Sequence, residues 1–231
     1  KWMRDDIGLK FTDEELKSYP FITPEMAFSE IEYLKSQREK YDGNVPERRV
    51  KSIDINSPNG EVFEEFDTGT SGKMQVSTTM VFVSLIGKLM KNENIGSRIV
   101  PIIPDEGRTF GMDPLFSEFE IFAPNGQKYT PVDHKMLLNY KESDTGQVLQ
   151  EGISEAGAIA SWIASATSYS TANSPTMPFY TFYSMFGFQR VGDQIWSASD
   201  ARGRGFLMGA TAGRTTLNGE GLQHQDGHSL L

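Results

Sequence analysis

The chain has 231 residues, of which 38% are hydrophobic, enough to build the core of one large domain or two smaller ones. Its net charge of −9 argues against non-specific binding to nucleic acid, which requires a cationic surface. The absence of cysteine excludes disulfides and thiolate chemistry and fits a cytoplasmic protein, and no apolar run is long enough to suggest a membrane span.

The first 72 residues are predicted to form a helical arm or linker. Thr12 and Glu15 have the spacing of a capping box at the start of a short helix. Thr23, followed by proline, is predicted to cap a longer helix that ends near Gly43. The rest of this segment carries turn residues and charges with little periodicity, so we expect a connecting arm without a core of its own.

Residues 73–231 show a different pattern, in which helices alternate with short, nearly all-apolar strands. Helices are predicted at 77–91, 154–167 and 189–200, strands at 98–103, 177–183 and 205–211, and a polar loop at 165–176. This alternation predicts an α/β fold with a parallel sheet covered by helices on both faces. Ligands of such sheets bind beyond the carboxyl ends of the strands, and polar clusters follow all three predicted strands.

Glu155 follows Ser154, a good N-cap residue, while Glu151 lies in the glycine-bearing turn before them. Two interpretations of Glu155 are open from the residues alone. In the first, the carboxylate is solvated and only complements the helix dipole. In the second, the uncharged sequence AGAIASWIASA behind it indicates that the helix N-terminus lies inside the molecule. A carboxyl group buried there needs a partner or stays protonated.

The segment GEGLQHQDGHS carries Glu220, His224 and His228. Their four-residue spacing suits ligands on one face of a helix, but the surrounding glycines disfavour a continuous helix and no third ligand pattern supports zinc. No metal ligand is therefore assigned. Two of the chain's three histidines in one glycine-rich loop indicate instead a site that handles protons or anionic groups, with a plain surface loop as the alternative.

The segment FYTFYSMFGFQR is dense in aromatic residues, which most often form core. Phe186 and Phe188, however, follow the predicted strand at a position where core residues are expected to thin out. An aromatic ring there is a candidate stacking surface for a flat ligand.

Five motifs together carry a resemblance to a known family: PIIPDEGRTFGM, KYTPVD, QEGISEAGA, PFYTFYSMFGFQRVGD and GRTTLNGEGLQHQDGHS. They closely resemble the homodimeric type of pyruvate dehydrogenase, specifically its thiamin diphosphate-dependent decarboxylating component. The resemblance covers about Met74 to Leu231, and more loosely the arm before it, and matches the middle, pyrimidine-binding domain. The diphosphate-binding domain that precedes it in the family and the C-terminal domain have no counterpart here, so we expect a piece of a longer protein with its last domain incomplete.

The resemblance assigns roles around the cofactor. It implies that Glu155 hydrogen-bonds a ring nitrogen of the aminopyrimidine and so favours the tautomer that activates the cofactor. Phe186 packs on the pyrimidine with Tyr183 adjacent, and Ile153 helps to hold the bent conformation of the cofactor. Asp105 and Glu106 resemble the acids that lie beside it.

The substrate side is assigned in the same way. Glu220 and His224 match residues that handle protons and bind the 2-oxo acid, and Arg190 is expected to complete a polar network. The implied reaction is oxidative decarboxylation of pyruvate in a homodimer, with acetyl transfer to a lipoyl group on a dihydrolipoyl acetyltransferase partner. Mg²⁺ is expected on the domain that this chain lacks, so the chain alone should be inactive.

Two alternatives stay open. One is another thiamin enzyme of transketolase type that acts on a different 2-oxo acid or on a sugar. The other is a non-catalytic interaction or dimerisation domain.

Overall fold

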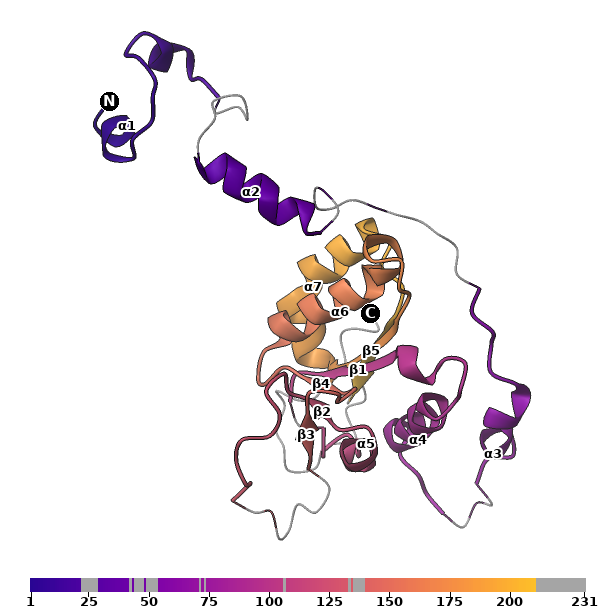
Figure 1. The fold of residues 1–231 in the computed structure, drawn as a ribbon. Helices are drawn as coiled ribbons and strands as arrows, with labels where there is room; N and C mark the ends of the chain where they lie inside the picture. Colours follow the sequence, from indigo (N-terminus) through magenta and orange to yellow (C-terminus); the bar gives the residue numbers. More distant parts are fainter. Residues whose placement is uncertain are drawn as a thin grey trace. The chain divides into compact units, whose positions relative to one another are not determined.

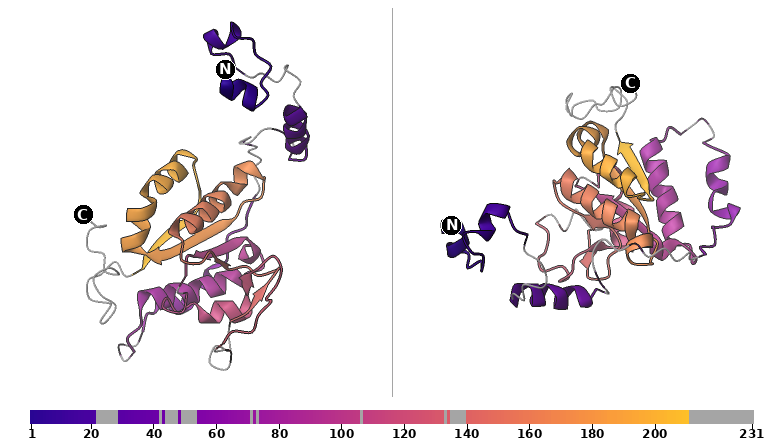
Figure 2. Two further views of the ribbon diagram at one scale, coloured as in Figure 1. Left: turned by 90° about the vertical axis from the view of Figure 1, so that its left-hand side faces the viewer. Right: turned by 90° about the horizontal axis from the view of Figure 1, so that it is seen from above.

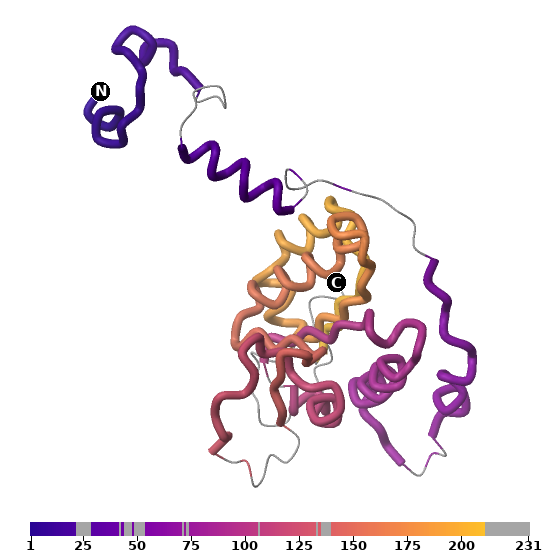
Figure 3. Tube along the Cα trace, viewed as in Figure 1, coloured from indigo at the N-terminus to yellow at the C-terminus, as the bar shows by residue number. Residues whose placement is uncertain are grey.

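A computed structural model describes residues 1–21, 29–41, 43, 48, 54–70, 72, 74–105, 107–132, 134 and 140–210 (Figure 3). The chain divides into two compact units, Lys1–Glu47 and Arg48–Leu231.

The first unit contains short helices with no buried residue. They are α1 (Trp2–Asp6), the 3-10 helix η1 (Glu15–Ser18) and α2 (Ser29–Glu39). The predicted capping box is confirmed: the Glu15 amide donates to the Thr12 hydroxyl at 3.2 Å, and the Thr12 amide donates to the Glu15 carboxylate at 2.7 Å. The Thr12 amide and the Thr12 hydroxyl both donate to the Glu15 carboxylate and hold its pKa below its ordinary value. The cap predicted at Thr23 lies outside the described residues.

The second unit holds the sheet and its helices (Figure 1). In chain order its elements are η3 (Gly60–Val62), α3 (Glu64–Asp67), α4 (Thr78–Met90), η4 (Gly96–Arg98), β1 (Ile99–Ile103), α5 (Asp113–Glu118), β2 (Ile121–Phe122), β3 (Glu142–Ser143), β4 (Leu149–Gln150), α6 (Glu155–Thr171), β5 (Met177–Tyr183), α7 (Ser184–Asp200) and β6 (Phe206–Ala210).

The main sheet has the strand order β4-β1-β5-β6, and every neighbouring pair is parallel. Ile102 of β1 pairs with Leu149 on one side and with Tyr180 on the other, which places β1 and β5 at the centre. A second, two-stranded parallel sheet joins β2 and β3.

Alternate residues of the central strands enter two separate cores. Phe179 and Tyr183 of β5 join the cluster that contains α4 and α5, while Tyr180 and Phe182 join the cluster that contains α6 and α7. Figure 2 shows these helix pairs on the two sides of the sheet. The predicted fold class, an α/β parallel sheet covered on both faces, is confirmed.

Two element predictions are wrong. Helix α6 continues to Thr171 through most of the predicted polar loop. The hydroxyls of Thr167, Ser170 and Thr171 donate to carbonyls three or four residues earlier, so these polar side chains are satisfied within the helix. Helix α7 begins at Ser184, directly after β5, instead of at Gln189.

Gly187 explains how α7 can start so close to the sheet. A Cβ atom at this position would lie 2.0 Å from the Phe182 ring, so only glycine allows the first turn of α7 to pack on β5. The helix is interrupted by a non-helical residue at Val191, near the start that the sequence predicts.

Candidate functional site

The candidate site lies at the carboxyl edge of the sheet. Because the strands are parallel, β1, β4, β5 and β6 all end at this edge. Asp105 follows β1, the turn that leads to Glu155 follows β4, and Phe186 follows β5. The continuation of β6 lies outside the described residues.

Glu155 is the first residue of α6, as predicted. The Gly157 amide donates to the Ser154 hydroxyl at 3.1 Å, which makes Ser154 the N-cap. Gly152 supports the preceding turn with a φ of +82°, in the left-handed region that favours glycine. The Glu155 side chain is only 13% exposed, so the carboxylate lies mostly inside the molecule.

Arg190 from α7 is the observed partner of this carboxylate. Its Nη1 lies 3.0 Å from both Glu155 oxygens, and its guanidinium group lies 4.3 Å from the centroid of the Phe186 ring. A planar cation therefore donates to the acid and stacks on an aromatic face at once. Three of the residues singled out from the sequence are thus brought together.

Phe186 is half-buried, and other aromatic rings support it from the core. The Tyr183 ring packs edge-on against it with centroids 6.3 Å apart, and Phe110 packs against Tyr183 at 5.0 Å. The FGF segment follows β5, as predicted, in the first turns of α7: Phe186 is only partly buried against the core, and Phe188 is exposed. Phe110 was missed in the sequence because a single aromatic residue in a loop gives no signal.

Asp105 contacts a second residue that gave no sequence signal. The Gln150 amide nitrogen donates to the Asp105 carboxylate at 3.2 Å, whereas the Gln150 amide oxygen is buried without a hydrogen-bond partner among the described residues. Glu151 accepts a hydrogen bond from the Ser161 hydroxyl of α6, which gives it a local structural partner.

Tyr180 of β5 lies fully buried on the α6 side of the sheet, and its hydroxyl also has no partner among the described residues. Burial raises the pKa of this phenol, and the negative charge of Glu155 raises it further. The phenol therefore stays neutral and lies within electrostatic range of the site acid.

The remaining candidates are less constrained. Ile153 is 85% exposed at the tip of the turn before α6. Glu106, Glu220, His224 and His228 lie outside the described residues. Within the described ranges, no three histidine or acidic side chains cluster as metal ligands, and no helix is both long and apolar enough to cross a membrane.

Comparison with known proteins identifies the family. Residues 54–231 match the family model described as "Pyruvate dehydrogenase E1 component middle domain". The chain is 52% identical to the pyruvate dehydrogenase E1 component of Cupriavidus necator and 52% identical to that of Pseudomonas aeruginosa, with 98% and 99% of the chain covered. It is 48% identical to the pyruvate dehydrogenase E1 component of Escherichia coli, with 99% of this chain covered. The chain spans about a quarter of these relatives, 25–26% of their length. It belongs to the family of the pyruvate dehydrogenase E1 component, in the part formed by the middle domain.

Proposed function

We propose that the chain is the pyrimidine-binding part of a thiamin diphosphate-dependent pyruvate dehydrogenase E1 component. The observation that carries this proposal is the mostly buried carboxylate of Glu155, which opens a helix at the carboxyl edge of the sheet beside the Phe186 ring. Membership of the family supports it.

The Glu155 carboxylate and the Phe186 ring together suit an aminopyrimidine ring. Such a ring is flat and carries nitrogen atoms that exchange hydrogen bonds with a carboxyl group. In the structure the planar guanidinium of Arg190 makes these two kinds of contact, donation to Glu155 and stacking on Phe186. The pair therefore accepts a flat, nitrogen-bearing partner.

Bound thiamin diphosphate would supply the electron sink for loss of carbon dioxide from a 2-oxo acid. In this proposal Glu155 holds a proton at the ring nitrogen, and Phe186 binds the ring face with Tyr183 behind it. The Glu155 side chain is only 13% exposed, and this partial removal from water would strengthen its hydrogen bond to the ring.

Other residues are assigned by the resemblance alone. Ile153 would pack against the cofactor, with Asp105 and Glu106 beside it, and Arg190 would complete a polar network. Glu220 and His224 would face the substrate and handle protons. We further propose that residues 1–72 act as a linking arm and residues 73–231 as the pyrimidine-binding domain.

The whole-protein activity is part of the same proposal. It is oxidative decarboxylation of pyruvate with acetyl transfer to a lipoyl group on a dihydrolipoyl acetyltransferase, carried out by a cytoplasmic homodimer. Diphosphate and Mg²⁺ would be held by a different domain. The 231-residue chain alone is then expected to bind the cofactor weakly and to turn over no substrate.

A chimera tests the substrate assignment. The corresponding segment of the Pseudomonas aeruginosa relative, 52% identical, is replaced by this chain, and reduction of a dye acceptor is followed with pyruvate, 2-oxoglutarate or a branched 2-oxo acid. We expect thiamin-dependent turnover with pyruvate in preference to the other two. Preference for another 2-oxo acid would point to a different thiamin enzyme. The proposed division of the cofactor between domains is tested separately, by calorimetry of the isolated chain. Micromolar binding of thiamin diphosphate and Mg²⁺ to that chain would contradict it.

A further inference from the structure

The hydroxyl of Tyr180 is a buried polar group to which the proposed function gives no role. Tyr180 lies fully buried in the middle of β5, and its hydroxyl has no hydrogen-bond partner among the described residues. The same face of this strand also accepts a phenylalanine, since the Phe182 ring packs 4.7 Å from the Tyr180 ring. Packing alone therefore does not require the hydroxyl, and a buried hydroxyl without a partner is unfavourable. We expect it to gain a partner in another state of the protein.

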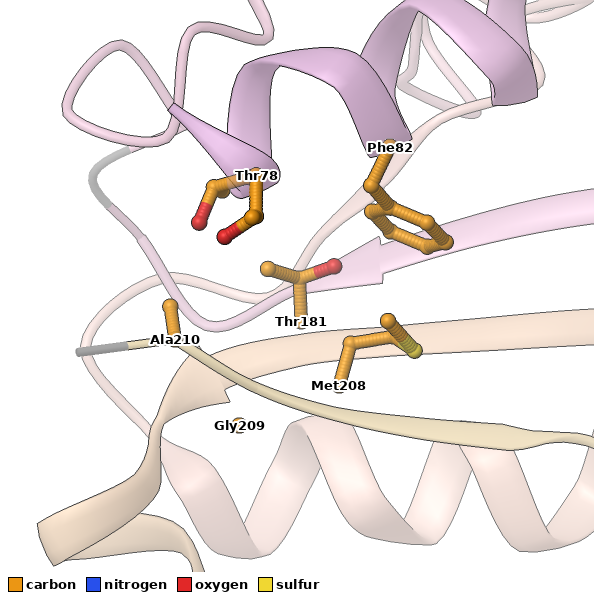
Figure 4. Close-up of a pocket in the computed structure, with 7 residues that line it drawn as sticks. Thr78, Phe82, Thr181, Met208, Gly209 and Ala210 are labelled. Atoms are coloured by element: carbon orange, nitrogen blue, oxygen red, sulfur yellow. The ribbon is translucent and has the colours of Figure 1, made fainter. Parts of the chain in front are cut away.

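The backbone of β5 directs Tyr180 toward α6 and α7. Figure 4 shows the next residue, Thr181, on the α4 side of the sheet, where it lines a small cavity together with residues of α4. Successive side chains of a strand point to opposite faces, so Tyr180 points away from α4. In agreement with this, Tyr180 belongs to the buried cluster that contains α6 and α7. It therefore packs with the two helices that carry Glu155 and Arg190.

Two observations connect this phenol with the Glu155 carboxylate. The buried cluster of Tyr180 contains Ala158, three residues after Glu155 in α6, and it also contains Val191, the residue after Arg190 in α7. Burial raises the pKa of the Tyr180 phenol, and the negative charge of Glu155 raises it further. The phenol therefore keeps its proton, which makes it a hydrogen-bond donor on the side of the sheet where Glu155 lies.

Arg190 holds both oxygens of Glu155 in this structure, with its Nη1 3.0 Å from each. The Arg190 side chain is 53% exposed and that of Glu155 only 13%, so the arginine can withdraw into solvent while the acid stays in place. In the proposed function a flat ring takes the position of the guanidinium group and uses one oxygen of the carboxyl group. The other oxygen then lacks the donor that it has here.

We propose that Tyr180 is a positioning residue for Glu155: once Arg190 is displaced, the Tyr180 hydroxyl donates to the carboxyl oxygen that the ring does not use, directly or across one water molecule. This hydrogen bond fixes the plane of the carboxyl group and thereby the oxygen that faces the ring nitrogen. The inference rests on the proposed function for the identity of the ring. It does not rest on it for the donor, because any loss of Arg190 should bring the phenol and the carboxylate together.

A double-mutant cycle in the 231-residue chain tests the donor without any cofactor. In the wild-type background, Y180F removes a hydroxyl that has no partner, so at pH 7 we expect the urea midpoint to stay unchanged or to rise. R190M keeps the aliphatic stem of Arg190 but has no donor. In this background Y180F removes a hydrogen bond to a carboxylate, and we expect the unfolding equilibrium constant to increase about tenfold. Equal effects of Y180F in both backgrounds, as a purely structural ring would give, would overturn the proposal.

Y169F is the matched control, because the Tyr169 hydroxyl donates to the Arg202 carbonyl at 2.9 Å, near the far end of α6. Its effect on the urea midpoint should be the same with Arg190 and with R190M. If the double variant does not fold, a crystal structure of R190M decides and also identifies the acceptor. We expect the Tyr180 Oη within about 2.5–3.0 Å of a Glu155 oxygen, or of a water molecule bound to that oxygen. A Tyr180 hydroxyl that still has no partner would overturn the proposal.

The chimera connects the positioning role with turnover. There we expect Y180F to lower kcat with pyruvate by about tenfold while KM stays within about twofold, because the acid is misplaced but pyruvate binding is kept. An unchanged kcat of Y180F in an active chimera would overturn the positioning role. If the unmodified chimera shows no thiamin-dependent turnover although the stability cycle gives the expected result, the proposed function is contradicted and the assignment of the donor is supported.

Discussion

The substitution E155Q separates the stabilising role of Glu155 from its proposed chemistry. Glutamine keeps the size of the side chain and its position after the Ser154 cap, but it removes the charge that pairs with Arg190 and the ability to hold or release a proton. The two consequences have very different sizes.

The structural loss is small. The Arg190 side chain is 53% exposed, so the ion pair is screened by solvent and contributes about 0.2–1 kcal/mol. The lost interaction with the helix dipole adds about 0.3–1 kcal/mol. We therefore expect the free energy of unfolding to fall by about 1 kcal/mol, which lowers Tm by about 2–4 °C for a chain of this size.

The catalytic loss is expected to be large. A positioned acid or base typically contributes about 100-fold or more to the rate. In the chimera, E155Q should reduce pyruvate-dependent dye reduction by at least about 100-fold, while circular dichroism and size-exclusion chromatography stay unchanged. The matched control is E151Q, four residues earlier, where the carboxylate accepts only a local hydrogen bond from Ser161 among the described contacts. Activity of E155Q within threefold of the wild type would refute the role of this acid, and normal activity with broken dimers would favour a purely structural domain.

Three further predictions follow from the packing. G187A should lower the free energy of unfolding by about 1–3 kcal/mol in a urea titration, because the added Cβ would meet the Phe182 ring at 2.0 Å; an unchanged midpoint would contradict the observed packing. F186L should weaken thiamin diphosphate binding to the chimera by about tenfold in calorimetry, because a flat stacking face is lost, and undiminished affinity would exclude this ring from the site. Burial raises the pKa of Tyr180, so the stability that depends on the neutral phenol is fully present below its unfolded pKa of about 10 and is lost as the pH rises above that value. Y180F should therefore unfold less readily than the wild type above pH ~10. Equal sensitivity of both chains to high pH would contradict this prediction.

Periodicity was sufficient to predict the main elements of the sheet. The strand 177–183 was placed at its observed bounds because apolar and aromatic residues run without interruption and turn residues flank them. The helix from Ser77 was also found, since an uncharged first turn and a run of apolar residues mark it. These are local signals, and the parallel sheet follows from their alternation.

Contacts between distant residues could not be predicted from local pattern. The prediction of a polar loop at 165–176 failed because serine and threonine hydroxyls bond to the helix backbone when tertiary packing stabilises the helix, which composition does not reveal. The short strands β2, β3 and β4 have two residues each, too few to show a period.

In the candidate site, too, local sequence patterns indicate single residues, whereas the contacts between distant residues appear only in the structure. The cap and the uncharged helix are local signals that made Glu155 a candidate, and the aromatic run did the same for Phe186, but their roles at the cofactor were assigned by the resemblance and remain predictions. The pairing of Glu155 with Arg190 joins residues 35 positions apart through the packing of α6 on α7, so no motif spacing contains it. The contact between Gln150 and Asp105 depends likewise on β4 and β1 being neighbours.

The most direct test of the central claim is a crystal structure of the chimera with thiamin diphosphate and Mg²⁺ bound. The account predicts that a Glu155 oxygen lies within hydrogen-bond distance, about 2.6–3.2 Å, of a nitrogen of the pyrimidine ring, with the Phe186 ring stacked on the same pyrimidine. A cofactor ring held by a different carboxylate, with Glu155 still paired only to Arg190, would contradict it.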